Sequence, residues 1–395
     1  MKKTFLLSCL MLAAMPVMAA YTGHVYVDKN KNGVFDQSEK PLAGIKVSDG
    51  LNVVETAADG SFTLPGHERE RFIFITTPSG YKTFNRHYHK IEKKQSGYDF
   101  GLIPYSGRIR KDGSHRYIHI TDTEIFNTEN HADWVNNVRD YARNEQAAFI
   151  IHTGDICYEK GLKAHIKLMN TENMDCPVFY CIGNHDLVKG KYGEELFESI
   201  YGPVYYSFDA GNVHYVVTPM SGGDHAPGYT SDDVCRWLKN DLAHIRPGTP
   251  VVVFNHDLLT YEDTFIFKSK NAGSINLNEY NLKAWVYGHW HINYMKKQGD
   301  VYSVCTSSLD KGGIDHSTTA FRVMHVDSKG DFTSELRYTY LDKNICIASP
   351  AGVMASGVLP VAVNVYSSVS PVREVLYTCP VSYTHLRAHE TSQDL

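Results

Sequence analysis

Short hydrophobic runs separated by turn residues dominate the first part of the chain. Between about Tyr21 and Leu102, runs such as His24–Val27 and Arg71–Ile75 are divided by Gly, Pro, Asn and Asp. Alternation with a period of two, interrupted by such turns, is typical of half-buried β-strands. The pattern predicts a small β-sandwich accessory domain over residues 21–102.

The pattern changes to strand, loop and helix further along. Buried-type strands are predicted at Tyr117–Ile120, Ala148–Ile151, Val178–Ile182, Val251–Phe254 and Ala284–Tyr287. Helix spacing follows the first of these, and Ser231 can cap a second helix whose apolar residues lie on one face. Strands that alternate with helices predict an α/β domain, here over residues 103–342.

β-type runs return after Asp342, at Ile345–Ala348 and Val361–Tyr366. Two or three strands do not close a domain, so residues 343–380 are interpreted as the truncated start of a C-terminal β domain. Residues 381–395 resemble one translated frame of a transposase adapter, which suggests a non-native tail. His385 and His389, spaced like a helical metal-binding pair, are therefore given no function.

The first residues have the features of a targeting segment. Lys2 and Lys3 precede an apolar stretch, Phe5–Val17, and a small-residue cleavage site ends at Ala19. This predicts a signal peptide over residues 1–20 and a periplasmic or secreted protein. No later segment is long and apolar enough to predict a membrane span.

Composition narrows the possible partners. The chain has 43% hydrophobic and 21% charged residues and a net charge of −5, without a basic stripe, so nucleic acid is not expected to bind. Apart from Cys9 in the predicted signal peptide, an odd number of cysteines remains at irregular spacing. This is not the pattern of a disulfide framework, and nothing in the sequence indicates the oligomeric state.

Five short polar blocks directly follow the predicted strands of the α/β region. They are Asp122-Thr123-Glu124, Gly154-Asp155, Gly183-Asn184-His185-Asp186, Asn255-His256 and Gly288-His289-Trp290-His291. Each block alone is more often a turn, a cap or a buried histidine. Because binding crevices form at the carboxyl ends of strands in α/β sheets, their joint occurrence predicts a single metal-binding cleft.

These blocks resemble the motifs of the calcineurin-like metallophosphoesterase superfamily: Asp-x-His, Gly-Asp, Gly-Asn-His-Asp/Glu, a later His, and Gly-His-x-His. The flanking β regions resemble the accessory domains of exported bacterial members. The resemblance, over roughly Tyr117 to Asp342, implies an αββα sandwich of two β-sheets flanked by helices. It also implies hydrolysis of a small phosphate monoester or diester by a hydroxide that bridges two metal ions.

The resemblance further implies residue roles. The first metal would be held by Asp122, Asp155 and His291. The second would be held by Asn184, His256 and His289, with Asp155 bridging both. His185 would protonate the leaving group, and Asp186 would orient it.

Two positions leave alternatives open. Glu124 stands where the family usually has His; a carboxylate can also bind a metal, and it would favour Mn²⁺ or iron, with zinc still possible. If Glu124 instead points away, the first site has one ligand fewer. Tyr158, in Gly154-Asp155-x-x-Tyr158, resembles the iron-binding tyrosine of purple acid phosphatases, or it lines the cleft.

A second candidate metal site lies in the predicted β-sandwich. Its residues have the spacing of a twelve-residue calcium loop and are Asp28, Asn30, Asn32, Val34, Asp36 and Glu39. The alternative is an Asn/Asp-rich turn without an ion. The alternative to an enzyme is a surface protein that binds glycan or envelope polymer and carries a degenerate phosphatase core.

Overall fold

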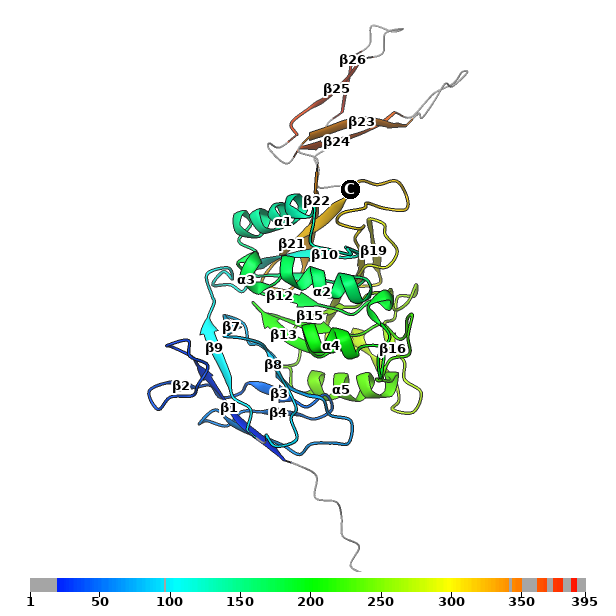
Figure 1. Ribbon diagram of the computed structural model, residues 1–395. Coiled ribbons are helices and arrows are strands. Elements are labelled where there is room, and N and C mark those ends of the chain that lie inside the picture. Colours follow the sequence, from blue (N-terminus) through cyan, green and yellow to red (C-terminus); the bar gives the residue numbers. More distant parts are fainter. Residues whose placement is uncertain are drawn as a thin grey trace, which may run out of the picture.

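The computed structural model of the chain describes residues 20–95, 97–340, 343–349, 361–367, 372–378 and 385–388 (Figure 1). The predicted signal peptide, except for its last residue, lies outside the described residues. Much of the predicted C-terminal domain and most of the predicted tail also lie outside them.

The N-terminal region is a sandwich of two β-sheets. One sheet contains β1 (Tyr21–Val27), β2 (Lys40–Pro41), β5 (Ser61–Leu64), β7 (Tyr81–Thr83) and β9 (Phe100–Pro104). The other contains β3 (Lys46–Ser48), β4 (Val53–Glu55), β6 (Phe72–Ile75) and β8 (Tyr88–Lys90). Strands β1 and β9 are parallel, and the other pairings in the two sheets are antiparallel.

Strand β6 joins this sandwich to the rest of the molecule. Ile73 and Ile75 belong to the core of the N-terminal sandwich, whereas Phe72 and Phe74 belong to the larger core of the α/β region. Successive side chains of a strand point to opposite faces, so one face of this sheet packs on the α/β region. Phe74 contacts Trp237 there, with ring centroids 6.3 Å apart.

Two further sheets form the α/β region. The first has the order β12-β11-β10-β21-β22, with β10 (His115–Ile120), β11 (Phe149–His152), β12 (Val178–Tyr180), β21 (Ala320–Val326) and β22 (Phe332–Tyr338). The second has the order β13-β14-β15-β18-β20-β19, with β13 (Tyr206–Ala210), β14 (Val213–Val217), β15 (Val251–Phe254), β18 (Leu282–Tyr287), β20 (Val301–Cys305) and β19 (Tyr294–Gln298). The predicted core of two β-sheets is confirmed.

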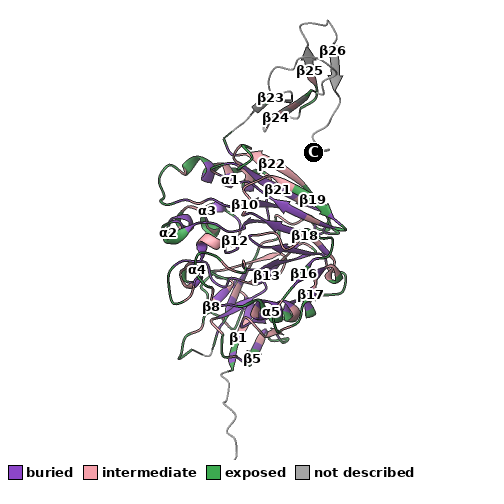
Figure 2. Ribbon diagram, turned by 90° about the vertical axis from the view of Figure 1, so that its right-hand side faces the viewer, coloured by how far each residue is buried: buried purple, intermediate pink, exposed green. Residues whose placement is uncertain are grey.

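Aromatic side chains fill the space between these sheets. Tyr117 stacks on Phe149 at 4.7 Å, and Phe179 of the first sheet stacks on Phe208 of the second at 3.7 Å. The strands that carry them are buried (Figure 2). Because large aromatic side chains contribute much of the apolar area that a core buries, this layer holds the two sheets in a fixed relation.

Helices cover the sheets. They are α1 (Ala132–Asn144), α2 (Tyr158–Leu168), α3 (Thr171–Met174), α4 (Glu195–Tyr201) and α5 (Ser231–Ala243), with short 3₁₀ turns η1 (Asn184–Asp186) and η2 (Leu277–Tyr280) and a small hairpin of β16 (Ile266–Phe267) and β17 (Ile275–Asn276). Thr230, and not the predicted Ser231, caps α5. Its hydroxyl accepts from the Asp233 amide, while the Asp233 carboxylate accepts from the Thr230 amide.

The candidate calcium loop is closed by its own hydrogen bonds. Buried Asp28 accepts from the Gly33 amide at 2.9 Å, and buried Glu39 accepts from the Lys29 amide at 2.8 Å. The side-chain amides of Asn30 and Asn32 both donate to Asp36, and the side chain of Val34 is exposed. These bonds give the loop a stable form as a turn, so calcium binding stays a prediction.

At the other end of the chain, β23 (Lys343–Ser349) pairs with β24 (Ala362–Ser367), and β25 (Val375–Thr378) pairs with β26 (His385–Ala388). Both predicted β-type runs lie within or next to these strands. His385 is part of a strand, and His389 lies outside the described residues. Among the helices that the structure describes, none combines the length and apolarity needed to cross a membrane.

Candidate metal centre

The predicted ligands converge at one edge of the two sheets. Asp122, Asp155 and Asn184 follow the carboxyl ends of β10, β11 and β12, and the three candidate histidines follow β15 and β18. Backbone hydrogen bonds of 3.0 Å join these loops, from the Asp122 amide to the Gly154 carbonyl and from the Gly288 amide to the His256 carbonyl. The His289 amide, which donates to Oδ2 of Asp122, and Nδ1 of His256, which lies 2.7 Å from the Thr153 carbonyl, connect the two pairs, so the loops form one rim.

The residues predicted for the second metal lie close together. Nε2 of His256 lies 3.1 Å from Oδ2 of Asp155, and its ring centroid lies 5.0 Å from that of His289. One potential ligand atom each from Asp155, His256 and His289 fall within 4.8 Å of one another. Asp155 also accepts a 3.0 Å hydrogen bond from the amide of His185, the residue after Asn184.

The residues predicted for the first metal form an adjoining group. Nε2 of His291 lies 3.2 Å from Oδ1 of Asp122 and 3.4 Å from Oε1 of Glu124. The two groups meet where Oδ1 of Asp122 lies 3.9 Å from Nε2 of His256. All seven predicted ligands thus come from the same rim of loops.

Three of these side chains have buried atoms with unused bonding capacity. Among the described residues, Oδ1 of Asp122, Oδ1 of Asn184 and Nε2 of His256 are buried and have no hydrogen-bond partner of acceptable geometry. Their other atoms are occupied: Oδ2 of Asp122 accepts from Thr121 and from the His289 amide, and Nδ1 of His256 lies 2.7 Å from the Thr153 carbonyl. Buried polar atoms are rarely left unpaired, and these oxygen and imidazole atoms are metal ligands by type. The residues present therefore fit bound metal.

The electrostatics of the site favour a cation. Burial lowers the pKa of His256, but the neighbouring carboxylates of Asp155 and Asp122 outweigh it and raise that pKa to about 10. The hydrogen bond at Nδ1 directs the lone pair or proton of Nε2 towards Asp155. Positive charge is therefore stabilised between His256 and the two aspartates.

Five of the predicted ligands also have an uncommon backbone conformation. The φ angles of Asp122, Glu124, Asp155, His289 and His291 are 49°, 44°, 54°, 65° and 50°. Non-glycine residues rarely adopt this left-handed region, and such strain costs about 1–3 kcal/mol each and concentrates at functional sites. The surrounding loops therefore hold these side chains at a cost in stability.

Two motif glycines are required by close approach. A Cβ atom on Gly183 would lie 2.2 Å from Oδ1 of Asp155, and a Cβ on Gly288 would lie 1.9 Å from Oγ1 of Thr121 and 2.5 Å from Oδ2 of Asp122. These contacts are far below van der Waals separation. The glycines in the motifs thus allow the loops to pack directly on the ligands.

His185 has a different partner from the one predicted. Its Nδ1 lies 2.8 Å from Oδ2 of Asp224, whereas buried Asp186 accepts from the backbone amides of Cys157 and Gly183. The prediction that Asp186 orients His185 is wrong, because its carboxylate is turned inward to hold two loops together. Asp224 lies in a distant loop without a motif, so sequence spacing had no signal for it.

Lys311 is a second residue that the sequence did not indicate. Its ammonium group contacts Oε2 of Glu124 and lies 5.9 Å from the ring centroid of Phe126. The Tyr158 ring stacks on Phe126 at 6.2 Å and lies 5.3 Å from that of His185. Tyr158 and Phe126 therefore form an aromatic pair beside His185 and Lys311.

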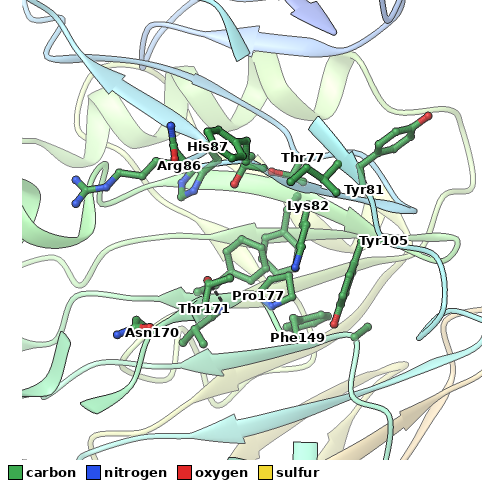
Figure 3. Close-up of a pocket in the computed structure, with 18 of the residues that line it drawn as sticks. Thr77, Tyr81, Lys82, Arg86, His87, Tyr105, Phe149, Asn170, Thr171 and Pro177 are labelled. Carbon is green, nitrogen blue, oxygen red and sulfur yellow. Dashed lines mark hydrogen bonds between the residues drawn. The ribbon is translucent and has the colours of Figure 1, made fainter. Parts of the chain in front are cut away.

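A large cavity lies away from the candidate metal centre. It has a volume of about 750 Å³ and lies between the N-terminal sandwich and the α/β region, lined by residues that include Lys82, His87, Tyr105 and Pro177 (Figure 3). Its lining includes the starts of β11 and β12, the opposite ends of these strands from the predicted ligands. None of the predicted metal ligands lines it.

Family models match two parts of the chain. Residues 29–104 match the N terminal of Calcineurin-like phosphoesterase, and residues 115–293 match Calcineurin-like phosphoesterase. Purple acid phosphatase 13 of Arabidopsis thaliana is 29% identical over 142 residues, which are 33% of this chain and 25% of that protein. The chain thus spans about a quarter of the length of this curated relative.

Weak matches among solved structures include phosphatases. A dimetal phosphatase from Danio rerio has a TM-score of 0.39 and 12% identity, over 55% of this chain and 98% of that one. Yfce, a phosphoesterase from E. coli, has a TM-score of 0.28 and 10% identity, over 56% of this chain and 98% of that one. On the two family models, which match the N-terminal region and the α/β region in turn, the chain belongs to the calcineurin-like phosphoesterases.

Proposed function

We propose that this protein hydrolyses a small phosphate monoester or diester with two metal ions bound between Asp122 and His291. The observation that carries the proposal is a set of three buried ligand atoms without a hydrogen bond of acceptable geometry, on Asp122, Asn184 and His256, in loops that follow three different strands. Asp122 also holds the strained φ of 49°, a cost in stability that a degenerate surface-binding core would have no reason to keep.

We assign the ligands as follows. Asp122, Glu124 and His291 would hold one ion, Asn184, His256 and His289 the other, and Asp155 would contact both. When bound, two such ions lower the pKa of a water molecule and offset the charge of the phosphate oxygens. Mn²⁺, iron and Zn²⁺ are all compatible with carboxylate, amide and imidazole ligands.

His185 would act on the leaving group. Burial lowers its pKa, but the hydrogen bond to Asp224 and the charge of Asp155 outweigh this and raise it. A protonated imidazole can donate to the oxygen of the departing alcohol. Since Asp224 contacts Nδ1, the free Nε2 is the atom that would carry this proton.

A second candidate is a purple-acid-phosphatase-like enzyme with ferric iron on Tyr158. The likeness to the Arabidopsis enzyme favours it, whereas the stacking of Tyr158 on Phe126 favours a role in the cleft wall. An iron–tyrosinate bond gives a visible charge-transfer band. We expect the pure protein to lack that band, and its presence would favour the second candidate.

Three further proposals concern the two ends of the chain. Residues 1–20 would direct export to the periplasm or beyond. Residues 343–380 would begin a C-terminal β domain, and residues 381–395 would be foreign to the native protein.

The proposed function is tested by metal analysis together with turnover of aryl phosphate monoesters and diesters. We expect about two metal ions per chain and hydrolysis that a chelator abolishes. Asp155→Asn should lose the bound metal and the hydrolysis, while Asp300→Asn, at an exposed aspartate, should keep the metal and the hydrolysis. Turnover that persists in Asp155→Asn, or that needs no metal, would refute the proposal.

A further inference from the structure

Another pair of aromatic side chains, Tyr261 and Trp290, borders the candidate metal centre. Trp290 lies between the predicted ligands His289 and His291 in the sequence, and its ring stacks against that of Tyr261, with centroids 5.8 Å apart and an angle of 27°. These residues border a cleft of about 620 Å³, which is lined by Asp257, Leu258, Tyr261, His289, Trp290, His291, Ile292 and Ile314. We call Tyr261 and Trp290, with the apolar Ile314 beside them, the aromatic wall.

The Trp290 ring is held in place from several sides. Its Nε1 donates a 3.0 Å hydrogen bond to Oδ1 of Asp257, and that carboxylate oxygen also accepts from the Leu258 amide at 2.7 Å. The edge of Tyr287 packs on Trp290 at 5.2 Å and 82°. Since its position is set before any ligand arrives, binding to this ring would cost little conformational entropy.

The outer members of the wall are unusually open to solvent. Tyr261 is 74% exposed and Ile314 is 75% exposed. Exposed apolar side chains that gather beside a cleft with polar groups mark a binding site more often than scattered ones do. Here the polar groups are His289 and His291, which line the same cleft.

The chemistry of the lining restricts the ligand. Apart from His289 and His291, the lining residues of this cleft contain no cationic side chain, and Asp257 is negative. An anionic substituent would be repelled, whereas a flat ring can stack on the exposed Tyr261 ring, which Trp290 supports from its other side. Because Trp290 is adjacent to two predicted ligands, the ring and the phosphate would belong to one small molecule.

We propose that the aromatic wall binds a planar ring on the alcohol of the phosphate ester, so that the substrates are esters of ring-bearing alcohols. This inference rests on the proposed function. Nucleosides and aryl alcohols share the required chemistry. A second aromatic pair, Phe126 and Tyr158, lies beside the charged Lys311, which makes it the poorer place for an uncharged ring.

The test uses the full chain and esters that differ only far from the reacting bond. They are 2-phenylethyl, 2-cyclohexylethyl, octyl and ethyl phosphate, all esters of primary alcohols. We expect kcat/KM for 2-phenylethyl phosphate to exceed that for ethyl phosphate about tenfold, because one ring stacked on aromatic side chains is worth roughly that much. Turnover of a nucleoside 5′-phosphate, compared with that of 2-phenylethyl phosphate, then distinguishes nucleosides from aryl alcohols as the source of the ring.

Variants locate the preference. Tyr261→Ala should lower the ratio of phenylethyl to ethyl turnover about fivefold or more, and Tyr261→Phe, which keeps the ring, should restore it. Phe126→Ala should leave the ratio as it is. The proposal is overturned if the ratio falls in Phe126→Ala and not in Tyr261→Ala, or if cyclohexylethyl or octyl phosphate is preferred.

A binding measurement separates this inference from the proposed function. We expect 2-phenylethylphosphonate, which cannot be hydrolysed, to bind about tenfold more tightly than ethylphosphonate in calorimetry, and Tyr261→Ala to remove the difference. Hydrolysis without any ring preference would overturn the inference and leave the function. Ring-selective binding without hydrolysis of any ester would overturn the proposed function and leave the ring site. Equal binding of the two phosphonates would overturn the inference.

Discussion

Lys311 contacts the carboxylate of Glu124, the one predicted ligand that departs from the family pattern. The other oxygen of that carboxylate lies 3.4 Å from Nε2 of His291. Glu124 is therefore shared between an ammonium group and the candidate metal centre. A neutral histidine at this position would not attract a lysine in this way, so the two residues are best understood as a pair.

The first prediction concerns this pair. An ammonium group beside a cation site opposes binding of a metal through charge repulsion and through competition for Glu124. We expect Lys311→Met to tighten metal binding at the more weakly bound site by on the order of tenfold. Calorimetric titration with Mn²⁺ measures it, with Lys296→Met, an exposed lysine, as the control. Unchanged or weaker binding in Lys311→Met would show that Lys311 does not compete with the metal.

The second prediction distinguishes the roles of Asp224 and Asp186, the two aspartates near His185. Asp224→Asn keeps the shape of the partner of His185 but removes its charge, so kcat should fall about 10–100-fold, as is usual when the residue behind a functional group is changed. Metal content and melting temperature should stay near those of the original protein.

Asp186→Asn should mainly lower the stability of the protein and not its kcat. One of the two backbone amides that Asp186 binds would face an NH₂ group, and a buried unpaired donor costs about 1–3 kcal/mol. The melting temperature should therefore fall. If Asp186→Asn is as stable as the original protein and loses only kcat, the role assigned to Asp224 is wrong.

Much of the α/β fold could be predicted because its central strands are continuously apolar. The predicted runs at Tyr117–Ile120 and Val251–Phe254 lie in β10 and β15, which are buried on both faces. Strands such as β19 and β22 were not predicted. In β19 only Gln298 is buried, and β22 is half-buried along most of its length, so neither has an apolar pattern that distinguishes it from a loop.

The grouping of the candidate ligands at one edge could be predicted for a related reason. Each follows a strand end directly, so the sheet topology places them together once the strands are known. Asp224 and Lys311 lie in long loops, and their contacts with His185 and Glu124 join residues 39 and 187 positions apart. No periodicity reports such contacts, because they depend on how the loops pack.

The third prediction tests the close approach at Gly183. This residue has an ordinary φ of −97°, so alanine is allowed by the backbone, but its Cβ would lie 2.2 Å from Oδ1 of Asp155. Gly183→Ala should displace that carboxylate and weaken metal binding at least tenfold. Gly222→Ala, where a Cβ meets no atom within 4 Å, is the matched control. Equal metal affinity in both variants would contradict the assigned position of Asp155.

The fourth prediction concerns the contact between the N-terminal sandwich and α4. Arg71 lies 2.7 Å from Oε1 of Glu194 and 3.0 Å from Oε1 of Glu198, and both carboxylates are buried. Burial and the charge of Glu194 outweigh the attraction of Arg71 and raise the pKa of Glu198 to about 8. One guanidinium thus faces two acids, and the second acid keeps its proton.

The sign of the pH effect follows from this shift. Between the ordinary glutamate pKa of about 4.3 and about pH 8, the folded protein binds a proton that the unfolded chain releases. The free energy of unfolding therefore falls as the pH rises through this window. Glu198→Gln has no such proton to lose, so its advantage over the original protein should grow from near zero below pH 4 to its full value above pH 8.

Even one pKa unit corresponds to about 1.4 kcal/mol, or roughly 2–4 °C in melting temperature for a domain of this size. Melting curves from pH 4 to 9 at fixed metal concentration measure the difference, and Glu172→Gln, at an exposed glutamate, should show none. A stabilisation of Glu198→Gln that is the same at every pH would mean that Glu198 does not hold a proton in the folded protein. In that case both acids would be ionised beside Arg71, and the extra negative charge would be stabilised by groups other than the guanidinium.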